Sequence, residues 1–211
     1  MVKEASTGTA LPDIEQRKRP VQERSRERVE RILNVAARLI TEKGIDALKT
    51  SEIAREAGIS LASLYRYFPN KTAVLKAIAE SHIEKLDGHM KAFAQNLDLE
   101  QGFDRLIDLY FAFYRSEPGY KEIWAGVEAL PELRELDLGE LYANARDISA
   151  GAQARFPEVD PQNLWLICVM LPRACGAVLR LAMTMPDAQA EVMVSELKLM
   201  VKSYLAIRLA G

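Results

Sequence analysis

Two short helical patterns separated by a glycine constrain the fold of this chain more than any other feature, and both lie within residues 44–71. The first pattern ends at Gly58, after about two turns of helix. The second begins near Ser60, whose hydroxyl can cap it. Leu64 and Phe68, spaced i and i+4, then share one helical face. This arrangement predicts two helices that meet at a steep angle around a tight turn.

A longer helix is predicted just before this segment, over residues 24–43. Gly44 follows at a position suited to a left-handed C-cap, and Thr50 or Ser51 can cap the next helix. The apolar stripe of the longer helix comprises Val29, Ile32, Leu33, Ala36, Leu39 and Ile40. The sequence therefore predicts a compact three-helix unit.

The outer face of the third helix carries unusual residues for a helix that only needs to be soluble. With Leu64 and Phe68 inward, Ala62 and Arg66 lie on the opposite face, flanked by Ser63 and Tyr65. Small residues allow close approach to DNA, Arg can contact guanine or phosphate, and Tyr hydroxyls bond phosphate oxygens. This pattern favours DNA binding, although helix-turn-helix geometry also occurs in proteins that bind no DNA.

Residues 26–86 resemble the N-terminal domain of the tetracycline-repressor (TetR) family. The resemblance rests on a shared pattern, Ile-Ala-x-x-Ala-Gly-Ile-Ser-x-x-x-Leu-Tyr-x-Tyr-Phe-x-x-Lys, which this chain carries from Ile53 to Lys71. It implies a helix-turn-helix motif at about residues 49–68, within an N-terminal DNA-binding domain that spans residues 24–86.

The resemblance also implies roles for individual residues. The implied DNA-contacting set is Lys49, Thr50, Ser51, Ser60, Leu61, Ala62, Ser63, Tyr65, Arg66, Tyr67 and Lys71. Family members usually have Thr or Ser where Lys49 stands, so a charge contact replaces a neutral cap bond there. They often have a polar residue or glycine where Leu61 stands. Two interpretations of Leu61 stay open: contact with a thymine methyl group, or inward packing, which the helical wheel slightly favours.

The charge distribution agrees with DNA binding at one end of the chain. Residues 1–80 hold 15 basic and 11 acidic side chains, whereas the remainder holds 13 and 19, although the whole chain carries a net charge of −2. Residues 1–23 are predicted to be a flexible basic tail. The basic run at residues 17–19 either follows DNA phosphates or is simply solvated.

Beyond residue 86 the whole chain is predicted to be helical, which makes the fold all-α: a helix-turn-helix head and a larger body over residues 87–211. The predicted helices span residues 70–95, 101–116, 119–127, 133–155, 161–184 and 187–209, with breaks at Pro and polar residues. The last two helices carry more apolar residues than one buried face needs, which predicts a homodimer built through them. The alternative is that they only close the core of the body.

Aromatic residues of the body suggest a pocket for a small hydrophobic or aromatic effector. The candidate ligand-binding residues are Phe103, Tyr110, Phe111, Tyr114, Trp124, Tyr142, Trp165 and Met170. An aromatic stripe at helical spacing is also typical of an ordinary core, so both interpretations stay open. Residues 117–160 hold ten acidic and four basic side chains, which suits a cationic ligand or a solvated acidic surface equally well.

The cysteines and histidines indicate neither catalysis nor a metal site. If Cys168 and Cys175 share one helix, their Cα atoms lie about 10 Å apart, too far for a disulfide. His82 and His89 have no activated nucleophile nearby, and no metal-ligand spacing or cofactor motif is found. We also find no signal peptide and no apolar run of roughly 18–20 residues that would span a membrane, so a cytoplasmic protein is expected.

Together these features predict a sequence-specific, dimeric transcriptional repressor that a small hydrophobic ligand releases from a palindromic operator in double-stranded DNA. Two other classes are weaker. A helical small-molecule-binding protein without DNA activity would leave Tyr65, Arg66 and Lys71 unexplained. An enzyme would need a reactive constellation that the sequence does not single out.

Overall fold

The computed structural model describes residues 15–16, 23–99 and 101–209. Its secondary structure over these residues is helical, which confirms the all-α prediction. The helices are α1 (Glu23–Lys43), α2 (Thr50–Glu56), α3 (Leu61–Tyr65), α4 (Lys71–Asn96), α5 (Gly102–Ser116), α6 (Tyr120–Ala129), α7 (Pro131–Arg155), α8 (Pro161–Ala182) and α9 (Asp187–Leu209). Most of the predicted tail, including the basic run at residues 17–19, lies outside the described residues.

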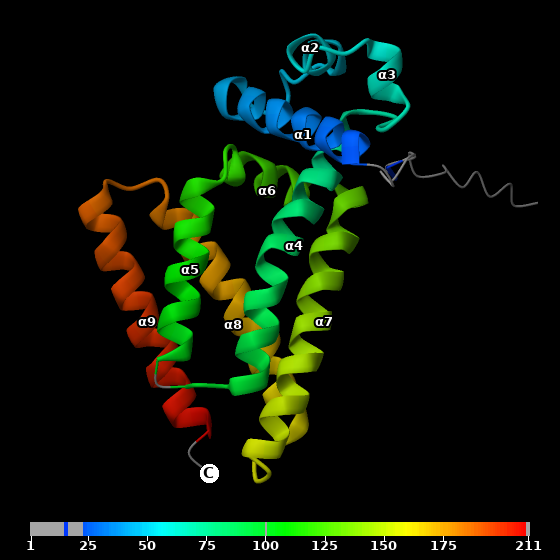
Figure 1. Cartoon of the computed structure of the whole chain (residues 1–211). Coiled ribbons are helices and arrows are strands. Elements are labelled where there is room, and N and C mark those ends of the chain that lie inside the picture. The colour runs from blue at the N-terminus through cyan, green and yellow to red at the C-terminus, as the bar shows by residue number, and fades with distance from the viewer. Residues whose placement is uncertain (1–14, 17–22, 100, 210–211) are drawn as a thin grey trace, which may run out of the picture.

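A three-helix head, α1–α3, lies at one end of a helical body made of α4–α9 (Figure 1). Helix α4 starts in the head and continues along the body, so the two parts share one continuous helix. The apolar core of the head also includes Ile123 and Val127 of α6 and Leu133 of α7, all fully buried. Helices α4 and α6 therefore pack directly against the head.

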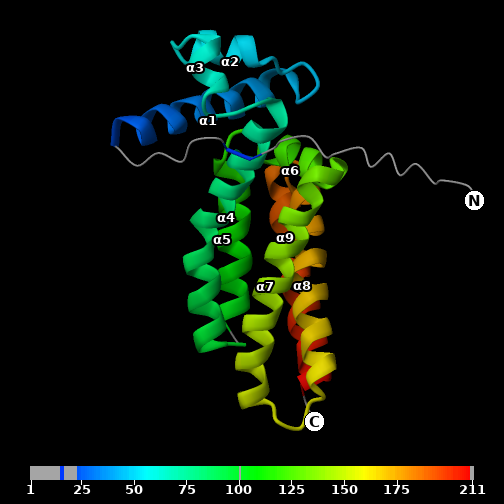
Figure 2. The same cartoon turned by 90° about the vertical axis from the view of Figure 1, so that its right-hand side faces the viewer.

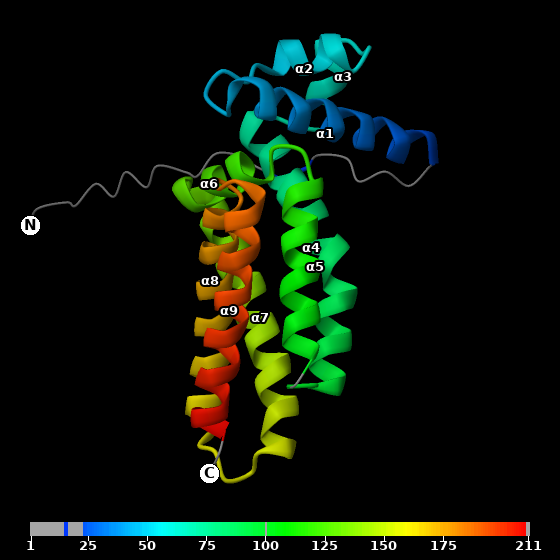
Figure 3. The ribbon, with the colours of Figure 1, turned by 90° about the vertical axis from the view of Figure 1, so that its left-hand side faces the viewer.

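Within the body, α8 and α9 pack side by side and form one edge, which the two side views show (Figures 2 and 3). Helix α4 packs against α6 and α7, and α5 packs against α9. A central apolar cluster joins α5, α8 and α9 through residues such as Phe111, Leu179 and Val201. The far end of the body has a second cluster, which includes Phe93, Ile148 and Leu164.

The turn signals of the head are mostly confirmed. Gly44 (φ 79°) and Gly58 (φ 67°) adopt the left-handed conformation that favours glycine. The Ser60 hydroxyl accepts a hydrogen bond from the Ser63 amide at 3.1 Å and caps α3. The predicted cap of α2 by Thr50 or Ser51 is wrong, because the helix begins one residue earlier than a Thr50 cap requires. Its N-cap is Lys49, whose side chain makes no capping hydrogen bond.

Gly119 is expected to be essential for the tight contact between α6 and the head. Its φ is +66°, and a Cβ added there would lie 2.9 Å from the carbonyl oxygen of Ala37 in α1. We expect Gly119→Ala to lower the free energy of unfolding by about 1–3 kcal/mol, since strain and backbone crowding add. Urea denaturation measures this change.

Gly139→Ala is the matched control, because Gly139 lies within α7 and a Cβ there meets nothing within 4 Å. Alanine is the better helix former, so this variant should gain up to about 1 kcal/mol. Equal stabilities of the two variants would show that the α6–α1 contact is looser than the geometry indicates.

Candidate functional site

The exposed surface of α2 and α3 is held together by one hydrogen bond between side chains. Thr50 Oγ1, at the start of α2, lies 3.1 Å from the Tyr65 hydroxyl at the end of α3. Both residues belong to the predicted DNA-contacting set. This bond fixes the separation of the two helices on the side where Arg66 and Ala62 are also exposed.

The exposed face of α3 agrees with the sequence analysis for most residues. Ala62, Tyr65 and Arg66 are exposed, and Ser63 is partly buried beneath them. Leu61 is 38% exposed, so the interpretation in which it packs inward is wrong. Because α3 starts at Leu61, this side chain projects from the first turn and never reaches the core below.

Two predicted phosphate-binding residues have partners inside the protein. Tyr67 is only 3% exposed, and its hydroxyl lies 3.2 Å from Ser25 Oγ of α1. Lys71 Nζ donates to the carbonyl oxygen of Ile45 at 3.2 Å. In this conformation both side chains stabilise the head. Phosphate contacts from Tyr67 and Lys71 stay predictions, and each would require the side chain to leave its partner inside the protein.

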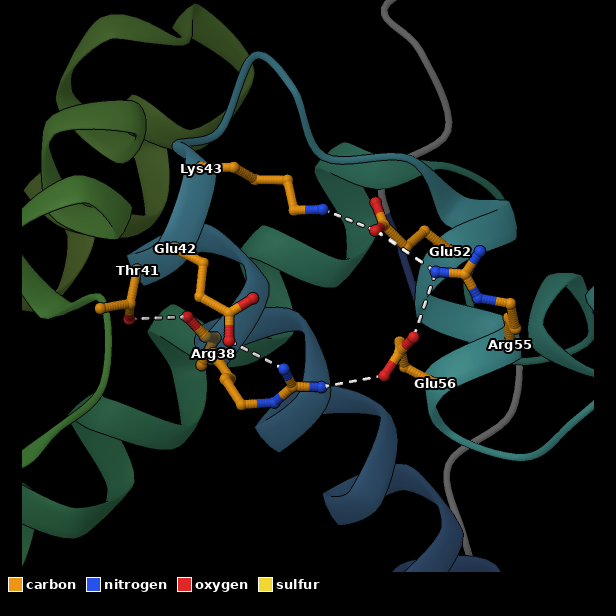
Figure 4. A network of polar contacts seen from close by, with 8 residues as sticks. Arg38, Thr41, Glu42, Lys43, Glu52, Arg55 and Glu56 are labelled. Atoms are coloured by element: carbon orange, nitrogen blue, oxygen red, sulfur yellow. Dashed lines mark hydrogen bonds and ion pairs between the residues drawn. The ribbon is translucent and has the colours of Figure 1, made fainter.

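A network of charged side chains joins the end of α1 to α2 (Figure 4). Arg38 pairs with Glu42 at 2.8 Å and Glu56 at 3.2 Å, and Lys43 donates to Glu52 at 2.5 Å. Arg55 lies 3.1 Å from Glu56 and 3.6 Å from Glu52. The hydrogen bond from Lys43 holds the pKa of the Glu52 carboxyl below its ordinary value. The network therefore ties α2 to α1, which fixes the angle at which the head presents α3.

The body contains a cavity of about 210 Å³ between α4, α5, α6, α7 and α8. Its walls are mostly apolar, with a few tyrosines, arginines and carboxylates. Phe103, Tyr110, Tyr114 and Trp124, which the sequence analysis proposed as ligand-binding residues, line this cavity.

The other four candidates do not line the cavity, which corrects the predicted ligand set. Phe111 is buried in the core between α5, α8 and α9. Tyr142 and Trp165 are 42% and 38% exposed and stack on each other, with ring centroids 6.0 Å apart. Met170 is 46% exposed. Aliphatic lining residues were missed, such as Leu86 and Met90 of α4, because the sequence signal that we used selects aromatic side chains only.

A buried histidine of α4 is hydrogen-bonded to a residue of the cavity wall. His82 is 2% exposed, and its Nδ1 accepts a hydrogen bond of 3.2 Å from the indole Nε1 of the cavity residue Trp124. Its Nε2 lies 3.5 Å from Glu117, and its ring stacks on Tyr120. Burial lowers the pKa of His82 to about 4, which outweighs the nearby Glu117 carboxylate. At neutral pH the ring is uncharged, and it carries its proton on Nε2 because Nδ1 accepts a bond.

Large apolar side chains remain exposed along α8 and α9. On α8 they include Leu166, Met170 and Leu181, and on α9 Val192, Leu199 and Ile207. Helix α8 is also long and apolar enough to cross a membrane by length and composition alone, contrary to the sequence analysis, and its most apolar window is only 22% buried. These exposed apolar side chains lie on the same two helices for which the sequence predicts the dimer interface.

Comparisons with known proteins find matches over both parts of the chain. Residues 32–78 match the model of the tetR family of bacterial regulatory proteins, and residues 98–205 match the model of a tetracyclin repressor-like C-terminal domain. The nucleoid occlusion factor SlmA of Mannheimia succiniciproducens is 28% identical over 129 residues. This match covers 60% of this chain and 60% of SlmA, less than two thirds of its length.

Solved structures of the same fold are similar over nearly their whole length. A TetR-family transcriptional regulator from Streptomyces coelicolor has a TM-score of 0.63 and 23% identity, covering 86% of this chain and 99% of that protein. The fatty acid degradation regulator FadR from Bacillus halodurans has a TM-score of 0.65 and 20% identity, covering 83% and 94%. At these identities the likeness shows a common fold.

Proposed function

Since this chain belongs to the TetR family of bacterial regulatory proteins, we propose that it is a sequence-specific DNA-binding repressor of transcription. The observation that carries the proposal is the surface of α2 and α3. There the Thr50–Tyr65 hydrogen bond fixes an exposed face that includes Arg66 and small side chains. Such a face can enter a major groove, with Arg reading a base edge and hydroxyls contacting phosphates.

The proposed active form is a homodimer built through α8 and α9, whose exposed apolar side chains would be buried against a second copy. One α3 helix of five residues reads few base pairs, whereas a two-fold pair reads both halves of a palindrome. We propose that the dimer acts in the cytoplasm, where it meets the DNA, and that α8 is an interface helix.

The proposed signal is a small hydrophobic molecule bound in the cavity of the body. Ligand binding would favour a conformation in which α4 and α6 are displaced and the two heads no longer fit successive major grooves. A ligand shifts this equilibrium only as far as its affinities for the two conformations differ. Residues Trp124 and His82 are suited to transmit the change, because their hydrogen bond joins α6 to α4 at the wall of the cavity.

Arg66→Ala is expected to weaken binding to the operator by about 10- to 100-fold, because a good contact between Arg and a base contributes roughly 1–3 kcal/mol. It should also reduce the preference for the operator over mutated operators. Mobility-shift titrations with DNA from upstream of the protein's own gene, at low and moderate salt, measure both effects.

Arg134→Ala is the control, since Arg134 is an exposed arginine of α7 in the body. It should bind DNA like the unmodified protein. A complete lack of binding by the unmodified protein at low salt would remove the proposed function. An equal loss for Arg66→Ala across all operator variants would remove only the base-reading role of Arg66.

A further inference from the structure

The lining of the cavity extends along the helices of the body. On α4 the lining extends from Ile83 to Phe93, which corresponds to about 15 Å along the helix. Among the lining residues, Tyr120 and Trp124 belong to α6, which lies next to the head, and Phe103 belongs to the start of α5, at the far end of the body (Figure 1). A lining of this length can accommodate an extended alkyl chain.

The two ends of the cavity differ in polarity. The far end is apolar, with Met90, Phe93, Phe103, Ile148 and Ile167 in its walls. Polar side chains lie nearer the head. Each carboxylate among them already accepts a hydrogen bond from a neighbour, namely Asp87 from Lys91 (2.6 Å), Asp137 from Arg173 (2.8 Å) and Glu140 from Asn144 (2.9 Å). Asp87 and Asp137 are thus balanced by cations, whereas the neutral Asn144 amide leaves the negative charge of Glu140 in place.

Arg180 is placed differently, because one of its nitrogens faces the cavity. Its Nη2 donates to Glu128 of α6 at 2.6 Å. Its Nη1 lies over Gly176, 3.3 Å from the point where a Cβ of residue 176 would stand, and the Tyr114 hydroxyl lies 3.8 Å from the same point. The absence of a side chain at Gly176 thus leaves room for a guanidinium and a hydroxyl to meet at the cavity wall.

The surroundings of this pair favour a negatively charged partner. The Arg180 side chain is 21% exposed, so its charge is only partly screened by water, whereas its partner Glu128 is 41% exposed. Burial raises the pKa of Tyr114, whereas its hydrogen bond with Tyr120 and then the Arg180 guanidinium act in the opposite direction. Tyr114 therefore stays neutral at physiological pH. Because Glu128 is 41% exposed, water can hydrate its carboxylate if Arg180 pairs with another carboxylate.

We propose that the cavity binds a single-chain amphiphile with a carboxylate head, which Arg180 and the Tyr114 hydroxyl hold while the alkyl chain extends toward Phe93. This inference rests on the proposed function, in which the cavity is the effector site. A guanidinium forms strong, charge-assisted hydrogen bonds with a carboxylate, and the apolar end removes the chain from water. The binding mode uses the only polar group of the described lining that bridges to α6 by an ion pair.

Binding of the carboxylate also explains how the signal leaves the cavity. The ligand would compete with Glu128 for Arg180 and release one tie between α8 and α6. Helix α6 packs closely on the head, since a Cβ at Gly126 would lie 2.5 Å from Ile45 Cδ1. A shift of α6 is therefore felt at the loop between α1 and α2.

Calorimetric titration of the full-length protein without DNA tests this inference. Decanoate, decanol and decyltrimethylammonium are probes with the same alkyl chain and an anionic, neutral or cationic head. Decanoate should bind at least about 10-fold more tightly than the other two. Arg180→Gln should weaken decanoate binding by about 10- to 100-fold and leave decanol binding unchanged.

Glu128→Gln provides a second variant with the opposite expected sign. It keeps Arg180 and removes the competing carboxylate, so decanoate should bind more tightly than to the unmodified protein. Arg115→Gln is the matched control, because the Arg115–Asp187 pair (2.8 Å) also joins two helices but lies outside the cavity lining. This control should bind decanoate normally.

The inference is overturned if decyltrimethylammonium binds as tightly as decanoate, if Arg180→Gln binds decanoate normally, or if none of the three probes binds. These outcomes are separable from a failure of the proposed function, since operator binding is measured on the unliganded protein. A protein that binds its operator but no decanoate would keep the repressor assignment and lose the carboxylate ligand.

Discussion

Leu181→Glu is expected to convert the protein into a monomer and to lower its affinity for a two-fold symmetric operator by about 100-fold or more. Leu181 is 50% exposed on α8, in line with the exposed Met170 and Leu166. In the proposed dimer the substitution would bury an unpaired carboxylate in each copy, which strongly disfavours association. Sedimentation velocity measures the mass, and anisotropy titrations measure binding to whole and half operators.

Ala92→Glu is a suitable control, because Ala92 is exposed on α4, away from the edge formed by α8 and α9. It adds the same charge and should remain dimeric. The monomeric Leu181→Glu protein should still melt cooperatively, since Leu181 contributes little to the core of its own chain. A Leu181→Glu protein that stays dimeric would place the interface elsewhere.

The head could be predicted closely from the sequence because its signals are local. Gly44 and Gly58 adopt positive φ, Ser60 caps α3 by accepting from the Ser63 amide, and Asn70 caps α4 by accepting from the Ala73 amide. Each of these features depends on a few neighbouring residues. The N-cap of α2 was predicted wrongly because it was judged from local residues alone. A Thr at the start of a helix is a good N-cap unless its hydroxyl has another partner. Here the Thr50 hydroxyl pairs with Tyr65, 15 residues later.

The cavity could be predicted only in part, because its lining depends on how distant helices face one another. Phe111 and Tyr110 are neighbours on α5, yet only Tyr110 lines the cavity, while Phe111 packs toward α8 and α9. Aromatic content alone cannot separate such a pair. The surface stack of Tyr142 and Trp165 was misjudged for the same reason, since nothing in the local sequence shows that α7 and α8 present these rings outward.

The role of His82 was also beyond the sequence, which offers only a lone histidine on a helix. Its partners come from separate elements: Trp124 from α6 and Glu117 from the turn between α5 and α6. Packing of these elements makes the ring both buried and hydrogen-bonded. The stability of the fold at low pH therefore depends in part on His82.

His82→Gln is expected to remove a large part of the acid sensitivity of the protein. Burial lowers the pKa of folded His82 to about 4, below the ordinary value of 6.5. The unfolded chain therefore binds more protons between these values, so the stability linked to His82 is present above about pH 6.5 and is lost as the pH falls toward 4. Between pH 7 and about pH 4.5 this loss amounts to about 2–3 kcal/mol.

Urea denaturation at both pH values measures the effect as a difference between proteins. The unmodified protein should lose about 2–3 kcal/mol more than His82→Gln over this interval, whatever the substitution does to stability at pH 7. Gln can still accept the Trp124 indole bond, so the comparison isolates the charge. His89→Gln changes the other histidine, which is exposed on the same helix, and should keep the full acid sensitivity. If His82→Gln and the unmodified protein lose stability equally, protonation of His82 on unfolding is not the cause of the acid sensitivity.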